Sequence, residues 1–186
     1  MNWQDQALVF LDYAHSVANN TTLLQKYKKS LLDTLLRRAS DIISSEDIKV
    51  HNNTASNIQH CKRWSKAAVE QYYAERDRLT EQRNGRPPTH RQLCELRDEN
   101  GKRLWLCEHR YPLLIPKTKL LEGCSFEEIS NWMFEYGYCT IIKREEDANL
   151  LLTTLDESVA KERYKNAGIT ITIHPELDHA NLASNG

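Results

Sequence analysis

The sequence predicts an α+β protein, with helices in the first part of the chain and a small mixed α/β part after them. Apolar residues recur every three or four positions up to residue 83 and then begin to alternate. Gly85 and Pro87-Pro88 stand where the period changes, and such residues end helices. We therefore expect a helical domain at residues 1–84, a small α/β domain at 89–174 and a mobile polar tail at 175–186.

Three helices are predicted in the N-terminal part. The first covers residues 3–18, whose apolar residues share one face. Thr22, with Gln25 three residues later, has the form of a capping box that opens the second helix. The two helices should pair as an αα-hairpin. A polar stretch separates them from a long third helix at 58–83.

A β-hairpin at residues 91–108 is predicted at the start of the α/β part. Asn100-Gly101 is the dipeptide best suited to a two-residue type I′ turn, and apolar residues alternate on both sides of it. This loop determines which residues face each other across the two strands. The expected pairs are Glu99 with Lys102, Asp98 with Arg103, Leu96 with Trp105, and Cys94 with Cys107.

The remaining elements follow from prolines, caps and periodicity. Two prolines confine any strand at 111–116 to a sheet edge. Ser125 and Glu128 form a capping box, which opens a helix that runs to Tyr136 and ends at Gly137. Further strands are expected at 138–143, 149–154 and 169–173, with a turn at 144–148 and a helix at 156–166.

Composition is typical of a globular protein, with 40% hydrophobic and 27% charged residues. Neither an export signal nor an apolar run of about 20 residues is evident, so we expect a cytoplasmic protein without a membrane span. Five cysteines, an odd number, fit a reducing compartment better than a disulfide framework.

Metal and cofactor chemistry has little support in the sequence. Histidines and cysteines are present, but no Cys-x-x-Cys spacing places two thiolates on one tight turn. The six glycines are isolated, so neither a P-loop nor a dinucleotide fingerprint occurs. We therefore predict no metal and no cofactor, with the cysteines packed as small buried hydrophobes.

Protein binding is the favoured function, because the chain has more large aromatic residues than its predicted cores obviously need. Such side chains dominate the centres of protein interfaces. Tyr73, Trp132 and Tyr136 are the candidate anchors for a partner protein. We expect a non-enzymatic adaptor or accessory subunit.

Two other functions remain open. Lys62, Arg63 and Lys66 surround Trp64, a pattern that suits phosphate contacts and base stacking in nucleic-acid binding. The third helix also carries acidic residues, and the charge is −5 over residues 112–186 against +4 over 61–111, which opposes a polyanion. The other alternative is a cysteine enzyme whose site the fold assembles around Cys107 and His109.

Two features of the chain resemble known bacterial proteins. Arg103–His109, Arg-Leu-Trp-Leu-Cys-Glu-His, resembles a segment of some large bacterial signalling proteins. The layout of a helical hairpin followed by an α/β part resembles small soluble accessory proteins of bacterial type IV secretion machines. The second resemblance implies membership of a larger assembly, and neither assigns a role to a particular residue.

Overall fold

The computed structural model describes residues 2–46, 58–150 and 156–177. The predicted α+β class is confirmed, since many helices accompany a small four-stranded sheet in the order β2-β3-β1-β4. None of the helices in these ranges is both long enough and apolar enough to cross a membrane. The chain divides into two compact units: unit 1 comprises residues 1–50, 109–139 and 152–162, and unit 2 comprises 51–108, 140–151 and 163–186.

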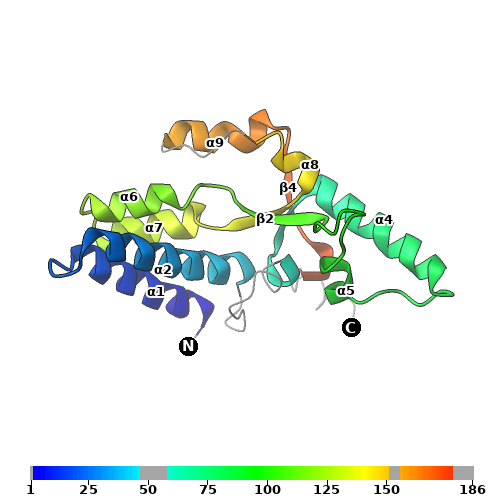
Figure 1. Cartoon of the computed structure of the whole chain (residues 1–186), viewed down its shortest axis with the longest axis horizontal. Coiled ribbons are helices and arrows are strands. Elements are labelled where there is room, and N and C mark those ends of the chain that lie inside the picture. Colours follow the sequence, from blue (N-terminus) through cyan, green and yellow to red (C-terminus); the bar gives the residue numbers. More distant parts are fainter. Residues whose placement is uncertain (1, 47–57, 151–155, 178–186) are drawn as a thin grey trace. The chain divides into compact units, whose positions relative to one another are not determined.

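Unit 1 is helical. Its helices are α1 (Trp3–Asn19), α2 (Gln25–Ser45), α6 (Leu114–Leu121), α7 (Phe126–Tyr136) and the first turns of α9 (Glu157–Asn166). α1 and α2 form the predicted hairpin, and α6 and α7 pack beside it (Figure 1). The buried aliphatic residues of all four helices meet in one core, which Tyr111 and Trp132 extend.

Helix starts in unit 1 partly differ from the prediction. Asn2 and Asp5 form a capping box at the start of α1. The capping box predicted from Thr22 is wrong, because the N-cap residue of α2 is Leu24 and its side chain cannot cap. The Asn20 side chain instead accepts hydrogen bonds from the Thr22 amide and hydroxyl. Thr22 is therefore part of the turn that precedes α2.

Residues 111–116 do not form the predicted edge strand, because α6 begins at Leu114. Pro116 lies in the first turn of this helix, where a backbone N–H has no helical partner to lose. The following helix is as predicted, since Ser125 and Glu128 cap α7 reciprocally. Gly137 is needed there for space, because a Cβ atom would lie 2.7 Å from the Met133 carbonyl oxygen.

Unit 2 is built on the sheet. Its elements are β1 (Arg63–Ser65), α4 (Lys66–Gln82), α5 (His90–Cys94), β2 (Trp105–His109), β3 (Cys139–Lys143), α8 (Arg144–Asp147), β4 (Ile171–Ile173) and the 3₁₀ turn η1 (Pro175–Leu177). β1 pairs in parallel with β3, where Trp64 faces Ile141, and antiparallel with β4, where Trp64 faces Thr172. Trp64 therefore lies at the centre of the sheet.

The predicted third helix at 58–83 is interrupted by a strand. Residues 58–60 are helical, β1 follows, and Ser65 then caps α4 by accepting a hydrogen bond from the Ala68 amide. β1 is only three residues long and depends on partners that are distant in sequence. The helical spacing of apolar residues over 58–83 therefore gave no indication of this strand. α4 follows β1 directly and belongs to unit 2, so the compact units differ from the predicted domains 1–84 and 89–174.

The predicted hairpin register is also wrong. A capping box between Thr89 and Gln92 opens α5, so Cys94 lies on a helix and not on a strand facing Cys107. The loop contains three residues, because the Asp98 amide donates to the Lys102 carbonyl and Arg97 pairs with Arg103. Only Gly101 has a positive φ, as in a type I turn followed by a bulge.

The C-terminal part largely follows the prediction. β3 and α9 form where expected, and β4 covers the end of the predicted strand at 169–173. α8 replaces the predicted turn at 144–148. Residues 149–150 are not in a strand, and the rest of the strand predicted at 149–154 lies outside the described residues. The segment predicted to be a mobile tail begins with the ordered turn η1, and residues 178–186 lie outside the described ranges.

Candidate functional site

Unit 2 contains a compact group of rings, which we call the aromatic cluster: Trp64, Tyr72, His90, Trp105 and His174. β1, α4, α5, β2 and the residue after β4 each supply one member. The His174 ring centre lies 4.6 Å from that of Trp64 and 4.5 Å from that of Tyr72. Trp64 and Trp105 are 5.8 Å apart, and both are fully buried. The cluster therefore forms the core where helices and sheet meet.

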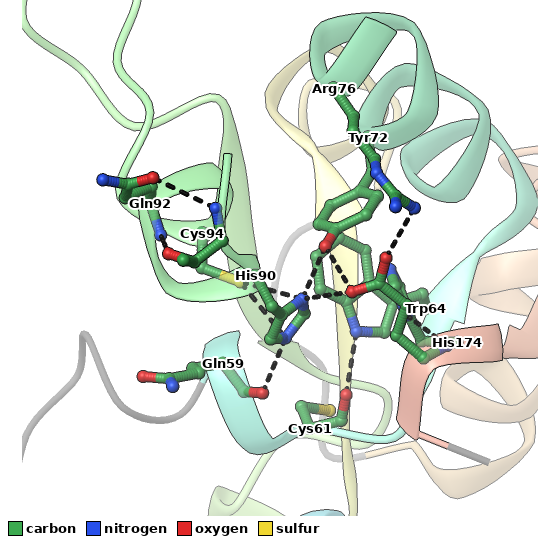
Figure 2. A network of polar contacts seen from close by, with 11 residues as sticks. Gln59, Cys61, Trp64, Tyr72, Arg76, His90, Gln92, Cys94 and His174 are labelled. Atoms are coloured by element: carbon green, nitrogen blue, oxygen red, sulfur yellow. Dashed lines mark hydrogen bonds and ion pairs between the residues drawn. The ribbon is translucent and has the colours of Figure 1, made fainter. Parts of the chain in front are cut away.

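A chain of polar contacts runs along one side of the cluster (Figure 2). His90 Nε2 lies 2.9 Å from the Gln59 carbonyl oxygen, and a carbonyl only accepts, so this nitrogen carries a proton. His90 Nδ1 lies 2.8 Å from the Tyr72 hydroxyl, which also lies 2.8 Å from Glu176 Oε2. Arg76 donates to Glu176 Oε1 at 2.9 Å. Glu176 thereby attaches η1 to α4.

The pKa values in this network show which groups are neutral. Burial, followed by the effect of Glu176, raises the pKa of Tyr72 and raises that of Cys94 to about 12. Burial lowers the pKa of His90, against the opposing effects of the Gln59 carbonyl and Glu176. At neutral pH the phenol and the thiol therefore keep their protons, and the site supplies hydrogen bonds rather than a nucleophile.

His174 is attached through both its backbone and its ring. Its backbone amide donates to the Lys62 carbonyl at 2.9 Å, and its Nδ1 accepts from the Glu176 amide at 3.3 Å. The side chain is fully buried, and among the described residues Nε2 has no hydrogen-bond partner. Burial, followed by the nearby His90, lowers the pKa of His174 to about 3.

Unit 1 contains another histidine, the half-buried His109, which has a different partner. The His109 imidazole is hydrogen-bonded to the Cys139 thiol. The Ser44 hydroxyl accepts from the Cys139 amide at 2.7 Å, and the Ser40 hydroxyl lies 3.6 Å from the Cys139 sulfur. Burial lowers the pKa of His109, but Cys139 and Asp41 raise it, and the net direction is upward. Cys139 is fully buried, so this pair is a packed part of unit 1.

The α1–α2 hairpin of unit 1 exposes a group of apolar side chains on each of its two helices. Val9 and Tyr13 are four residues apart on α1, while Leu24, Tyr27 and Leu31 follow at three- and four-residue steps from the start of α2. This spacing places each group on one side of its helix. Leu24 is 61%, Tyr13 57% and Tyr27 53% exposed. We call these five residues the apolar row.

The predicted anchors for a partner protein lie elsewhere and are more buried. Trp132 is only 7% exposed and donates to Glu157 at 2.6 Å. Tyr136 is half-buried, with its ring centre 5.7 Å from that of Trp132. Tyr73 is half-buried against Tyr72, with ring centres 5.4 Å apart. Among the described residues of unit 1, the exposed aromatic side chains are those of Tyr13 and Tyr27, neither of which was predicted as an anchor.

The predicted nucleic-acid site does not assemble around an accessible ring. Trp64 is fully buried, and its indole nitrogen donates to the Cys61 carbonyl at 2.8 Å. Lys62 and Arg63 are half-buried, and only Lys66 is exposed. These residues straddle β1 and the start of α4 instead of sharing one helix face. Base stacking on Trp64, which motivated the prediction, is therefore unavailable in this fold.

The predicted cysteine site is also rearranged. The His109 imidazole is hydrogen-bonded to Cys139, and the half-buried Cys107 lines a pocket of about 310 Å³. Within the described ranges, no group of three His, Cys, Asp or Glu side chains could hold a metal ion. Comparison of the chain with models of protein families, with curated proteins and with solved structures gives no match.

Proposed function

We propose that this protein is a non-enzymatic adaptor or accessory subunit that binds a partner protein through the apolar row of α1 and α2. The observation that carries this proposal is the concentration of exposed apolar side chains on one hairpin. Five of the eight large apolar residues exposed in the described part of the chain belong to the row. Two of them are tyrosines, which contribute strongly to binding when an interface buries them.

The kind of partner follows from the shape and charge of this surface. Apolar residues at helical spacing on two packed helices match the apolar face of an amphipathic helix. Lys26 and Lys29 are exposed beside Tyr27, and the Lys26 ammonium lies 4.8 Å from the centre of its ring. We therefore expect a partner helix whose apolar face is flanked by acidic side chains, because these complement the lysines.

The experiment combines site-specific cross-linking with an affinity measurement. A photoreactive phenylalanine analogue at position 27 is activated in cells, and mass spectrometry identifies the partner and the cross-linked peptide. The purified partner is then titrated against the wild-type protein and against a Tyr27→Ser, Leu31→Ser double variant. We expect a cross-link to an acidic amphipathic helix, and a Kd that rises at least about tenfold in the variant because two interface side chains are lost.

Val159→Ser is the matched control, because Val159 is an exposed apolar residue of unit 1 outside the row. It should leave the Kd unchanged. A cross-link only to a second copy of the chain, or an equal loss of affinity in the control, would contradict the proposal. So would low-nanomolar, salt-sensitive binding to RNA or DNA that is lost on replacing Lys62, Arg63 and Lys66, since that result would make nucleic-acid binding the primary function.

A further inference from the structure

We propose that His174 is a pH-sensitive attachment point. Its protonation releases the segment His174–Leu177 from the aromatic cluster of unit 2. Histidine is the side chain whose charge normally changes between pH 5 and pH 8, and buried histidines serve as switches where only one protonation state fits. This inference concerns unit 2 alone and goes beyond the proposed binding function.

The contacts of His174 admit only the neutral ring. Nδ1 uses its lone pair to accept the Glu176 amide, so a proton on Nδ1 would place two donors against each other. The proton of the neutral ring is then on Nε2, which is buried and lacks an acceptor among the described residues. An imidazolium would therefore lose one hydrogen bond and leave a buried charge uncompensated.

The groups around His174 offer a new charge little compensation. Those on the neighbouring elements are Lys62 and Arg63 at β1, Tyr72, Tyr73 and Arg76 on α4, His90 and Cys94 on α5, and Glu176 in η1. The sole carboxylate among them is that of Glu176, and Arg76 and Tyr72 already bind it. The His90 ring centre is 5.3 Å away, so two charged imidazoles would repel each other.

His90 responds differently although it belongs to the same cluster. When His90 is neutral, the one proton of the Tyr72 hydroxyl must serve both His90 Nδ1 and Glu176 Oε2. A proton on His90 Nδ1 would satisfy both contacts, and Glu176 lies 3.6 Å from that nitrogen. The lowered pKa of His90 shows that burial still disfavours its charge, but a proton on His90 Nδ1 would meet a carboxylate, whereas a proton on His174 Nδ1 would meet an amide N–H.

The segment that depends on His174 is short and has few other attachments. Its backbone is attached by the hydrogen bond from the His174 amide to the Lys62 carbonyl. Its side chains are attached by the contacts of the Glu176 carboxylate with Tyr72 and Arg76. β4, which precedes it, pairs with β1 over three residues. Once His174 leaves the cluster it titrates near its ordinary pKa, so the equilibrium for release shifts with pH below about 6.5.

The test uses the wild-type chain. Nuclear magnetic resonance follows the imidazole of His174 and the hydrogen exchange of its amide from pH 7.5 to pH 5. Because release binds one proton, we expect the opening constant, corrected for the intrinsic exchange rate, to rise about 30-fold between pH 7.5 and pH 5. The amide of Gly137, which donates to the Met133 carbonyl in unit 1, provides the internal reference. An imidazole of the folded protein that titrates at or above pH 6.5 would overturn the proposal.

Two variants separate protonation from packing. His174→Asn keeps a side-chain acceptor near the position of Nδ1, and His174→Phe keeps the ring, but neither side chain takes up a proton. Both should make the opening constant independent of pH, with folding at pH 7.5 checked by circular dichroism. His15→Asn, on α1 in unit 1, is the control and should retain the wild-type pH response. A 30-fold rise that persists in both His174 variants would assign the effect to another group.

Discussion

The two units of this protein have cores of different chemistry. Unit 1 is filled mainly by aliphatic side chains from α1, α2, α6 and α7. Unit 2 is organised around Trp64, which contacts rings from α4, α5, β2 and the end of β4. An aliphatic core responds mainly to changes of volume, whereas a core that includes imidazole rings also responds to protons.

The largest expected effect is the loss of Trp64. Trp64→Ala removes a fully buried ring that meets four others and also donates a hydrogen bond to Cys61. We expect the free energy of unfolding to fall by about 3–5 kcal/mol, which can unfold a domain of marginal stability. Chemical denaturation, followed by near-ultraviolet circular dichroism, measures this loss.

Leu36→Ala is the matched change in unit 1, where Leu36 is also fully buried. It should cost about 2–5 kcal/mol but should leave the chemical shifts of the aromatic cluster unchanged. If Trp64→Ala cost less than Leu36→Ala, Trp64 would not be the organising residue of unit 2.

Local periodicity predicted unit 1 far better than unit 2, and the reason is physical. α1 and α7 are long enough for their apolar faces and caps to appear in the sequence. β1 has three residues and forms by pairing with β3 and β4, which are distant in sequence and which no local pattern connects to it.

The hairpin register failed for a related reason. Asn100-Gly101 was correctly placed in a turn, but the Asp98 side chain accepts hydrogen bonds from the Asn100 and Lys102 amides and stabilises a loop of three residues. The prediction considered the preferences of the two central residues and not this side-chain acceptor. The Thr89 capping box, which turns Cys94 onto a helix, was visible in the sequence but was not used.

The candidate sites were harder to predict than the elements. The sequence does not connect His90 with its partners, because its contacts with Tyr72 and Glu176 span 18 to 86 positions and depend on the fold. His174 carried no signal, since a single histidine after a strand is unremarkable in sequence. The pairing of His109 with Cys139 likewise requires two strands that lie 30 positions apart.

The two units should also respond to pH in opposite directions. The pKa of His174 is lowered, so its contribution to stability is present above about pH 6.5 and is lost as the pH falls. The pKa of His109 is raised, so its contribution is present below about pH 6.5 and is lost as the pH rises through the folded value. From pH 7.5 to pH 5, the uptake of a proton at His174 on unfolding should cost about 2 kcal/mol.

Hydrogen exchange resolved by residue measures this contrast. Protection of β4 amides should weaken toward pH 5, while protection of β2 near His109 should weaken toward alkaline pH. Cys139→Ser removes the sulfur that raises the pKa of His109, so it should lower that pKa and leave the pKa of His174 unchanged. Parallel responses of the two histidines would show that a shared property of the protein, and not their separate partners, controls them.

The smallest expected effect compares one helix cap from each unit. Ser125 caps α7, which has 11 residues, and Thr89 caps α5, which has five; each accepts a hydrogen bond from the third helical amide. Replacing either cap by alanine should cost about 1 kcal/mol.

α7 buries Ile129 and Met133 completely and should remain helical, whereas α5 has few residues beyond its cap to stabilise it. We therefore expect Thr89→Ala to increase amide exchange throughout α5 and to disturb the contact between His90 and Tyr72, while Ser125→Ala should increase exchange only in the first turn of α7. Equal and local fraying in both helices would show that the fold, and not the capping box, holds His90 in place.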